Sequence, residues 1–200
     1  TTHPQAIRDL ERTLDISRTL FISASKSGST LETRSHTDYF WERNPRGDNW
    51  VAITDPGSEL EQLAREREFA AIFPGEPTIG GRYSALSAFG MVPAALMGID
   101  VDRLLLRAVE MAEACRLAEG NPGLELGLSL GENWKDGRDK VCIAPSSAVP
   151  NSGGVGLWAE QLIAASTGKH GKGPPPPPQE PGRGPDPPAP RTGPAGAPGP

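Results

Sequence analysis

The sequence predicts an α/β fold built on a parallel β-sheet. Three short apolar runs are typical of buried strands, and a helical pattern stands between each run and the next. Because parallel strands joined in this order need a crossover helix, the alternation favours a sheet flanked by helices. A third observation sets the limit of the domain: 13 of the 22 prolines lie in residues 174–200.

The bulk properties exclude several classes of protein. A chain of 200 residues with 36% hydrophobic side chains can form one medium domain. Its net charge of −5 argues against a nucleic-acid binder, and no apolar run is long enough to span a membrane. No signal segment opens the chain. Cys115 and Cys142 are flanked by apolar residues, which predicts buried, reduced thiols and favours a cytoplasmic setting.

The first strand is expected at Thr19–Ser25. A helix precedes it, capped by Thr2 or His3 and carrying apolar residues at helical spacing. Another helix follows it, beginning near Ser29, because Ser29 and Glu32 have the spacing of a capping box.

The second strand is expected at Trp50–Thr54, where an apolar run ends in a strong turn signal. Ser58 and Glu61 form a second capping box, which predicts a helix to about Glu68. The third strand is expected at Phe69–Phe73.

The rest of the chain is expected to be mainly helical. A largely apolar segment, 84–97, contains Pro93, which predicts a kink or an interruption. The segment 100–119 is the clearest amphipathic helix, and its apolar face predicts a contribution to the core. Three further elements are expected: a helix at 124–134, a fourth strand at Val141–Ala144, and a last helix around 157–163.

The turn from Ser25 to Thr30 is the leading candidate for a binding site. It joins the first strand to a helix N-terminus and supplies several hydroxyls and the ammonium of Lys26. Free backbone N–H groups and the helix dipole favour an anion at such a place, and phosphate is the natural occupant. The spacing matches neither a nucleotide P-loop nor a dinucleotide motif. The alternative is a polar loop with a good helix cap.

A second signal is Gly80-Gly81-Arg82. Two glycines let the backbone approach a ligand, and a guanidinium stabilises negative charge on oxygen. The alternative is a turn followed by a surface arginine. The formal S-x-x-K at Ser23–Lys26 lacks the other motifs of serine acylases. The histidines have no metal-ligand spacing and are expected on the surface: His3, His36 and His170.

Three segments, in order along the chain, resemble the glucose-6-phosphate isomerase family. Ile22–Thr33 resembles the phosphosugar-binding turn of sugar isomerase (SIS) domains, and Thr78–Gly90 resembles a signature of the family. Trp158–Ile163 and Ser166–Gly173 are similar to a further family segment. The resemblance is closest to the isomerase half of bacterial transaldolase/glucose-6-phosphate isomerase fusions.

The resemblance implies a three-layer SIS-type (flavodoxin-like) domain over residues 1–173. The family interconverts glucose 6-phosphate and fructose 6-phosphate through a cis-enediol, without metal or cofactor, and commonly as a homodimer. Arg82 would stabilise the enediolate, with Gly81 near the substrate. The remaining site residues would hold the phosphate: Ser25, Lys26, Ser27, Thr30 and Thr33.

The sequence departs from the family pattern in two places. The family's catalytic glutamate aligns with Ala165, which cannot take a proton. Glu160 lies about 140° away around a helix, so it would not replace that glutamate. After Gly173, where the family would continue with a second SIS domain, a ring-opening histidine and a late lysine, the resemblance gives way to a Pro/Gly-rich tail, 174–200, for which we expect disorder. The break indicates a truncation or a reading-frame shift.

These departures leave three hypotheses about function. The first is an impaired, truncated isomerase, and the second is a non-catalytic SIS module that binds a phosphosugar as a sensor or regulator. The third is a proline-rich adaptor acting through Pro174–Pro178, which is weaker because no P-x-x-P context with flanking basic residues accompanies it.

Overall fold

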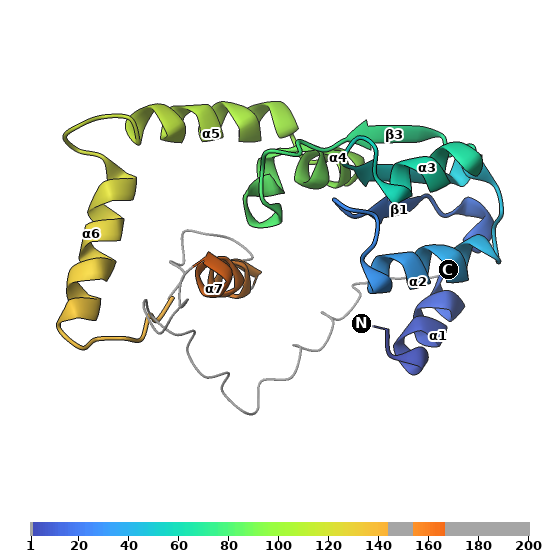
Figure 1. The fold of residues 1–200 in the computed structure, drawn as a ribbon, viewed down its shortest axis with the longest axis horizontal. Helices are drawn as coiled ribbons and strands as arrows, with labels where there is room; N and C mark the ends of the chain where they lie inside the picture. Colours follow the sequence, from blue (N-terminus) through green and yellow to red (C-terminus); the bar gives the residue numbers. More distant parts are fainter. Residues whose placement is uncertain (1, 144–153, 167–200) are drawn as a thin grey trace, which may run out of the picture. The chain divides into compact units, whose positions relative to one another are not determined.

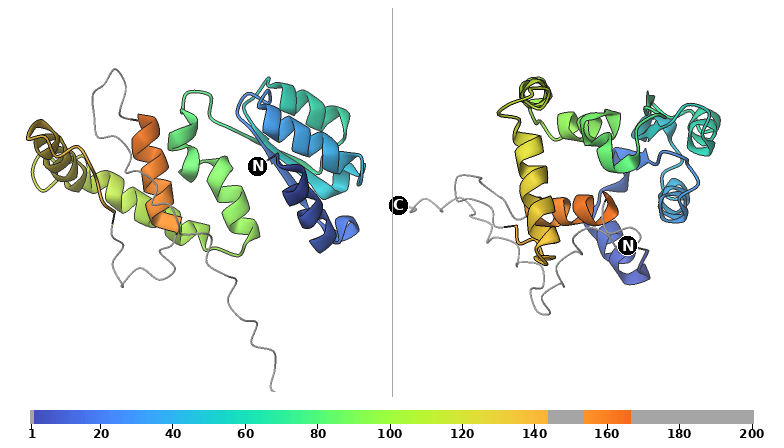
Figure 2. Two further views of the ribbon diagram at one scale, coloured as in Figure 1. Left: turned by 90° about the horizontal axis from the view of Figure 1, so that it is seen from below. Right: turned by 60° about the vertical axis from the view of Figure 1, so that its left-hand side comes forward.

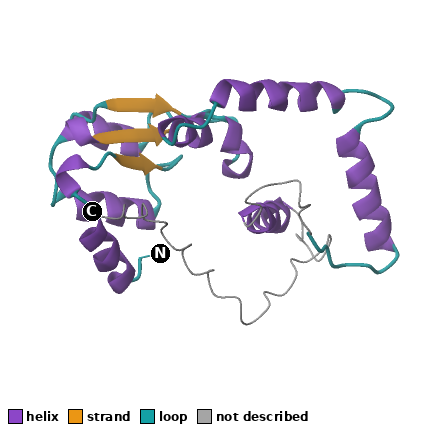
Figure 3. Ribbon diagram, turned by 180° about the vertical axis from the view of Figure 1, so that it is seen from behind, coloured by secondary structure: helices purple, strands orange, loops and turns teal. Residues whose placement is uncertain are grey.

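The computed structural model describes residues 2–143 and 154–166 (Figure 1). It forms two units, 1–130 and 131–200. The first unit contains a three-stranded parallel sheet in the order β1-β2-β3 (Figure 3). Its strands are β1 (Phe21–Ala24), β2 (Trp50–Thr54) and β3 (Ala71–Pro74). Phe21 pairs with Trp50, and Val51 pairs with Ala71, which confirms the predicted parallel α/β fold.

Helices of the first unit flank this sheet. Two of them make the crossovers between strands: α2 (Leu31–Trp41) and α3 (Glu59–Glu66). The helices before and after the sheet are α1 (Pro4–Thr13), α4 (Ala88–Leu96) and α5 (Val101–Ala114), and three short 3₁₀ turns complete it: η1 (Ile16–Arg18), η2 (Gly47–Asn49) and η3 (Gly81–Leu86). The order of elements follows the predicted one.

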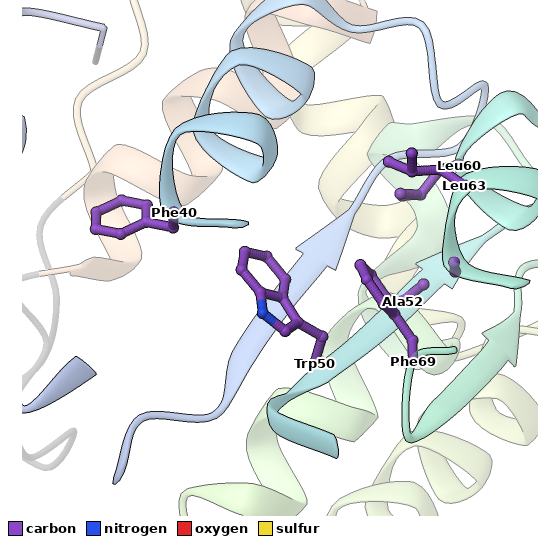
Figure 4. Close-up of a cluster of buried hydrophobic side chains, with 7 residues drawn as sticks. Phe40, Trp50, Ala52, Leu60, Leu63 and Phe69 are labelled. Carbon is purple, nitrogen blue, oxygen red and sulfur yellow. The ribbon is translucent and has the colours of Figure 1, made fainter. Parts of the chain in front are cut away.

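The core lies between β2 and the two crossover helices. Side chains alternate between the faces of a strand, so Trp50 and Ala52 share one face. They pack with Phe40 of α2 and with Leu60 and Leu63 of α3 (Figure 4). Both crossover helices therefore cover this face of the sheet (Figure 2).

The opposite face of β2 is buried as well. Val51 and Ile53 point to that face, and Ile53 has no exposed surface. The helix α4 contacts β2, so the sheet has helices on both faces. This arrangement explains why β2 reads as a continuous apolar run, which is typical of a parallel strand buried on both sides.

Several predicted details of the first unit are confirmed. His3 caps α1, with Pro4 in its first turn, and Ser58 caps α3 by accepting from the N–H of Glu61. The structure adds that Gly98, which follows the C-cap of α4, has a positive φ, the conformation that favours glycine at this position.

Two helix predictions are wrong in part. The Ser29–Glu32 capping box does not form, because α2 starts one residue later, with Thr30 as its N-cap. Ser29 instead bonds to the Ser27 hydroxyl. Pro93 does not interrupt α4, which continues through it to Leu96.

The prediction that the apolar face of α5 is part of the core is also wrong. None of its residues is buried, and Leu104, Leu105 and Met111 are 39%, 38% and 56% exposed. Cys115 and Cys142 are free, as expected, but both are exposed rather than buried. An apolar face is buried only where another element covers it, and within residues 2–143 no element covers this one.

The remaining helices are α6 (Pro122–Lys135) and α7 (Val155–Ser166). Both match predicted helices. The fourth strand is wrong, since residues 141–143 have no strand structure, and Ala144 lies outside the described residues. The predicted tail, 174–200, also lies outside them. No helix in the described ranges is long and apolar enough to cross a membrane.

Candidate functional site

The turn from Ser25 to Thr30 lies at the carboxyl edge of the sheet. It begins directly after β1, where the N–H of Ser25 donates to the Ile53 carbonyl at 3.0 Å. The Lys26 carbonyl accepts from the N–H of Asp55 at 3.2 Å. These two bonds continue the β1–β2 pairing into the turn, so the turn starts from a fixed position beside the end of β2.

The hydroxyls of the turn are held by one another. The hydroxyls of Ser25 and Thr30 are 3.1 Å apart, and the N–H of Gly28 donates to Ser25 Oγ at 3.1 Å. The hydroxyls of Ser27 and Ser29 are 2.8 Å apart. Ser25 is 7% exposed, whereas the side chains of Ser27 and Thr30 face solvent. One buried hydroxyl therefore orders the turn, and exposed hydroxyls surround it.

Gly28 gives the turn its shape. Its φ is +75°, a left-handed conformation that favours glycine. A Cβ at this position would lie 2.3 Å from the backbone nitrogen of Leu60, in the first turn of α3. The turn after β1 thus rests directly against the start of the next helix.

The N-terminus of α2 opens from this turn. Thr30 is the N-cap, but its side chain makes no capping bond to the helix backbone. The first N–H groups of a helix lack intrahelical acceptors, and the helix dipole places partial positive charge there. This end of α2 therefore offers N–H donors beside the exposed hydroxyls of the turn, an arrangement suited to an anion.

Lys26 is the cation of the turn, and its ammonium has two protein acceptors. Its Nζ donates to Asp55 Oδ1 at 2.9 Å and to the Glu76 carbonyl at 2.8 Å. The ring of Phe89 lies 5.8 Å from the same nitrogen. The Lys26 side chain thus joins the segments that follow all three strands. Neither Asp55 nor Phe89 was predicted as a site residue, although the Asp-Pro-Gly turn after the second strand placed Asp55 at this edge.

Thr33 lies in the first turn of α2 but lines a separate hollow. This cavity of about 240 Å³ is formed by the residues of β1 together with α2 residues such as His36 and Thr37. The other predicted phosphate ligands do not line it. The structure therefore brings four of these residues together in the turn and places Thr33 on a neighbouring surface.

Gly81 and Arg82 begin η3, on the segment that follows β3. A Cβ at Gly81 would meet no atom within 4 Å, so open space adjoins it. Arg82 is exposed, with its guanidinium 6.0 Å from the Tyr83 ring. In the same loop, the hydroxyl and the N–H of Thr78 donate to the Glu76 carboxylate and hold the pKa of that carboxyl below its ordinary value. Lys26 links this loop to the turn, through the Glu76 carbonyl.

These features define an α/β protein with a hydroxyl-rich, anion-suited turn at the carboxyl edge of a parallel sheet. No family model matches the chain. Glucose-6-phosphate isomerase of Gloeothece citriformis is 38% identical over 162 residues, which are 76% of this chain and 30% of the relative. That of Citrifermentans bemidjiense is 40% identical over 163 residues, which are 77% of this chain and 30% of the relative.

A solved structure has a similar fold. A hypothetical protein from Thermus thermophilus superimposes with a TM-score of 0.70 at 30% identity, covering 84% of this chain and 41% of that one. Over about three quarters of its length the chain is similar to these glucose-6-phosphate isomerases. It spans about 30% of the length of the curated relatives it matches.

Proposed function

We propose that the Ser25–Thr30 turn holds the phosphate of a hexose 6-phosphate, as part of a glucose-6-phosphate isomerase. The observation that carries the proposal is the N-terminus of α2, which has no side-chain cap and adjoins exposed hydroxyls. Backbone N–H groups and hydroxyls of Ser25, Ser27 and Thr30 supply the hydrogen bonds. Lys26 contributes positive charge at the same edge. Thr33 lies close by, in the first turn of α2.

Arg82 has a different role in this proposal. Aldose–ketose isomerisation passes through an enediolate, and a guanidinium is suited to charge that develops on its oxygen. The open space beside Gly81 leaves room for a substrate next to the backbone. An interaction made mainly in the transition state changes turnover more than binding. Arg82 is therefore the catalytic residue of the proposal.

Proton transfer between the two sugar carbons also needs a base. The position aligned with the family's glutamate is Ala165, on α7, and an alanine methyl group cannot accept a proton. We therefore propose that this chain binds hexose 6-phosphate but turns it over slowly. The same observation favours a second candidate function, a SIS module that binds a phosphosugar as a sensor or regulator.

Titration calorimetry with fructose 6-phosphate tests the binding step. The chain should release or absorb heat at millimolar ligand, whereas fructose without phosphate should give none. Ser25→Ala should weaken binding, because it removes the hydroxyl that orders the turn. An unchanged affinity in that variant, or no heat with the unaltered chain, would exclude this turn as the site.

A coupled isomerase assay separates the two functions. If the chain is an isomerase lacking its base, Ala165→Glu should raise turnover well above that of the unaltered chain, while Ala164→Glu, its neighbour on α7, should not. Binding without turnover in every variant would show that restoring the glutamate alone is not sufficient, as expected for a sensor and for an isomerase that lacks the rest of its length. Normal turnover by the unaltered chain would contradict the proposed role of the missing glutamate.

A further inference from the structure

The ion pair between Lys26 and Asp55 is less exposed to solvent than a typical surface ion pair of this chain, such as Arg12–Asp9. The side chains of Lys26 and Asp55 are 25% and 19% exposed, against 72% and 57% for Arg12 and Asp9. The Lys26 ammonium also has a backbone acceptor, the Glu76 carbonyl. Three contacts, with the Phe89 ring as the third, hold this nitrogen at one place.

The backbone at the same point forms a second set of bonds between the strand ends. The Asp55 N–H donates to the Lys26 carbonyl, and the Gly75 N–H donates to the Thr54 carbonyl at 2.7 Å. Gly75 leaves room for the Asp55 carboxylate, since a Cβ there would lie 2.3 Å from Asp55 Oδ1 and 2.9 Å from the Phe89 ring. Backbone and side chain together fix the Asp55 carboxylate on the ammonium.

We propose that Asp55 is a positioning residue, which holds Lys26 so that its side chain ties the ends of the three strands and sets the shape of the phosphate-binding turn. The inference rests on the proposed function for its ligand. Lys26 then acts mainly by ordering the turn, and the N–H groups and hydroxyls make the direct contacts with the anion.

The alternative is that Lys26 binds the phosphate directly and that Asp55 only neutralises it. The two possibilities predict opposite signs for Asp55→Asn. If Asp55 competes with the ligand for the ammonium, its neutralisation should tighten fructose 6-phosphate binding. If Asp55 positions Lys26, Asp55→Asn should weaken binding by about tenfold, because the turn must then be ordered when the ligand binds. Asp48→Asn is the control, since Asp48 is exposed and precedes β2 at the opposite edge of the sheet.

Amide hydrogen exchange tests, without any ligand, whether Asp55 and Lys26 hold the ends of the three strands together. Asp55→Asn and Lys26→Met should speed exchange of the Asp55 and Gly75 amides by at least about tenfold, while amides of the buried strand β2 keep their protection. Lys26→Arg keeps a donor for Asp55 and should retain more protection than Lys26→Met. Lys135→Met, which removes an exposed lysine from α6, should change neither amide.

Gly75→Ala is a third, charge-conserving test. Its Cβ should displace the Asp55 carboxylate and speed the same two amides, whereas Gly127→Ala, where a Cβ meets open space, should not. Unchanged amides in Asp55→Asn would overturn the inference whether or not fructose 6-phosphate binds. Faster amide exchange in Asp55→Asn, together with no fructose 6-phosphate binding by the unaltered chain, would support the positioning role of Asp55 and reject the proposed function. Tighter binding by Asp55→Asn would assign Lys26 as a direct ligand instead.

Discussion

Gly28→Ala tests how the candidate turn is built. The new Cβ would lie 2.3 Å from the backbone nitrogen of Leu60 and 2.9 Å from its Cβ, so the turn and α3 would have to separate. A non-glycine residue in the left-handed region costs about 1–2 kcal/mol, and overpacking costs a further 1–3 kcal/mol. We therefore expect a loss of about 3 kcal/mol in the free energy of unfolding.

Urea unfolding, followed by circular dichroism, measures this loss. With a slope of about 2 kcal/mol per molar urea, the midpoint should fall by about 1.5 M. Gly127→Ala is the matched control, because its Cβ meets open space and alanine favours a helix interior. It should leave the midpoint unchanged or raise it. A loss below about 1 kcal/mol in Gly28→Ala would show that the turn does not rest rigidly on α3.

Three further predictions concern the core, an ion pair and the proposed catalytic residue. Leu63→Ala should lower the free energy of unfolding by about 2–5 kcal/mol in the same urea assay, because Leu63 is 7% exposed in the core cluster. The Tyr39 hydroxyl and then Arg43 hold the pKa of Glu11 below its ordinary value of 4.5. A lowered pKa stabilises the fold above about pH 4.5 and this effect is lost as pH falls through the lowered value. Glu11→Gln should therefore reduce the melting temperature more at pH 7 than in acid. Arg82→Ala should leave fructose 6-phosphate affinity within about twofold in calorimetry. In the coupled assay it should reduce turnover of the Ala165→Glu variant by about 100-fold, which corresponds to a barrier raised by roughly 3 kcal/mol. Equal effects on affinity and turnover would contradict a transition-state role.

The sheet could be predicted from the sequence because its signals are local. Trp50–Thr54 is apolar on both faces and bounded by turn residues, and such a run has few alternatives to a buried parallel strand. Val141–Ile143 has the same local character but no strand partner within the described residues. A strand needs a neighbour for its hydrogen bonds, and that neighbour is not encoded in the run itself.

The apolar face of α5 shows the same limit for helices. Its periodicity correctly predicted a helix, but burial depends on what packs against it. The capping-box error at Ser29 has a different cause. Ser29 had a competing partner two residues away, the Ser27 hydroxyl, and this local bond moved the helix start to Leu31.

The candidate site depends both on local sequence and on contacts between residues far apart in the chain. The hydroxyls of Ser25–Thr30 were predictable because they lie within one six-residue segment that follows an apolar run. The partner of Lys26 was not, because Asp55 lies 29 residues away and meets it only after β1 and β2 pair in parallel. Parallel pairing brings the residues after each strand to one edge, so an acidic residue after the second strand becomes a neighbour of a basic residue after the first. The electrostatics of this turn therefore follow from the topology of the sheet, and a lysine in the motif cannot be assigned to a ligand before its carboxylate neighbour is known.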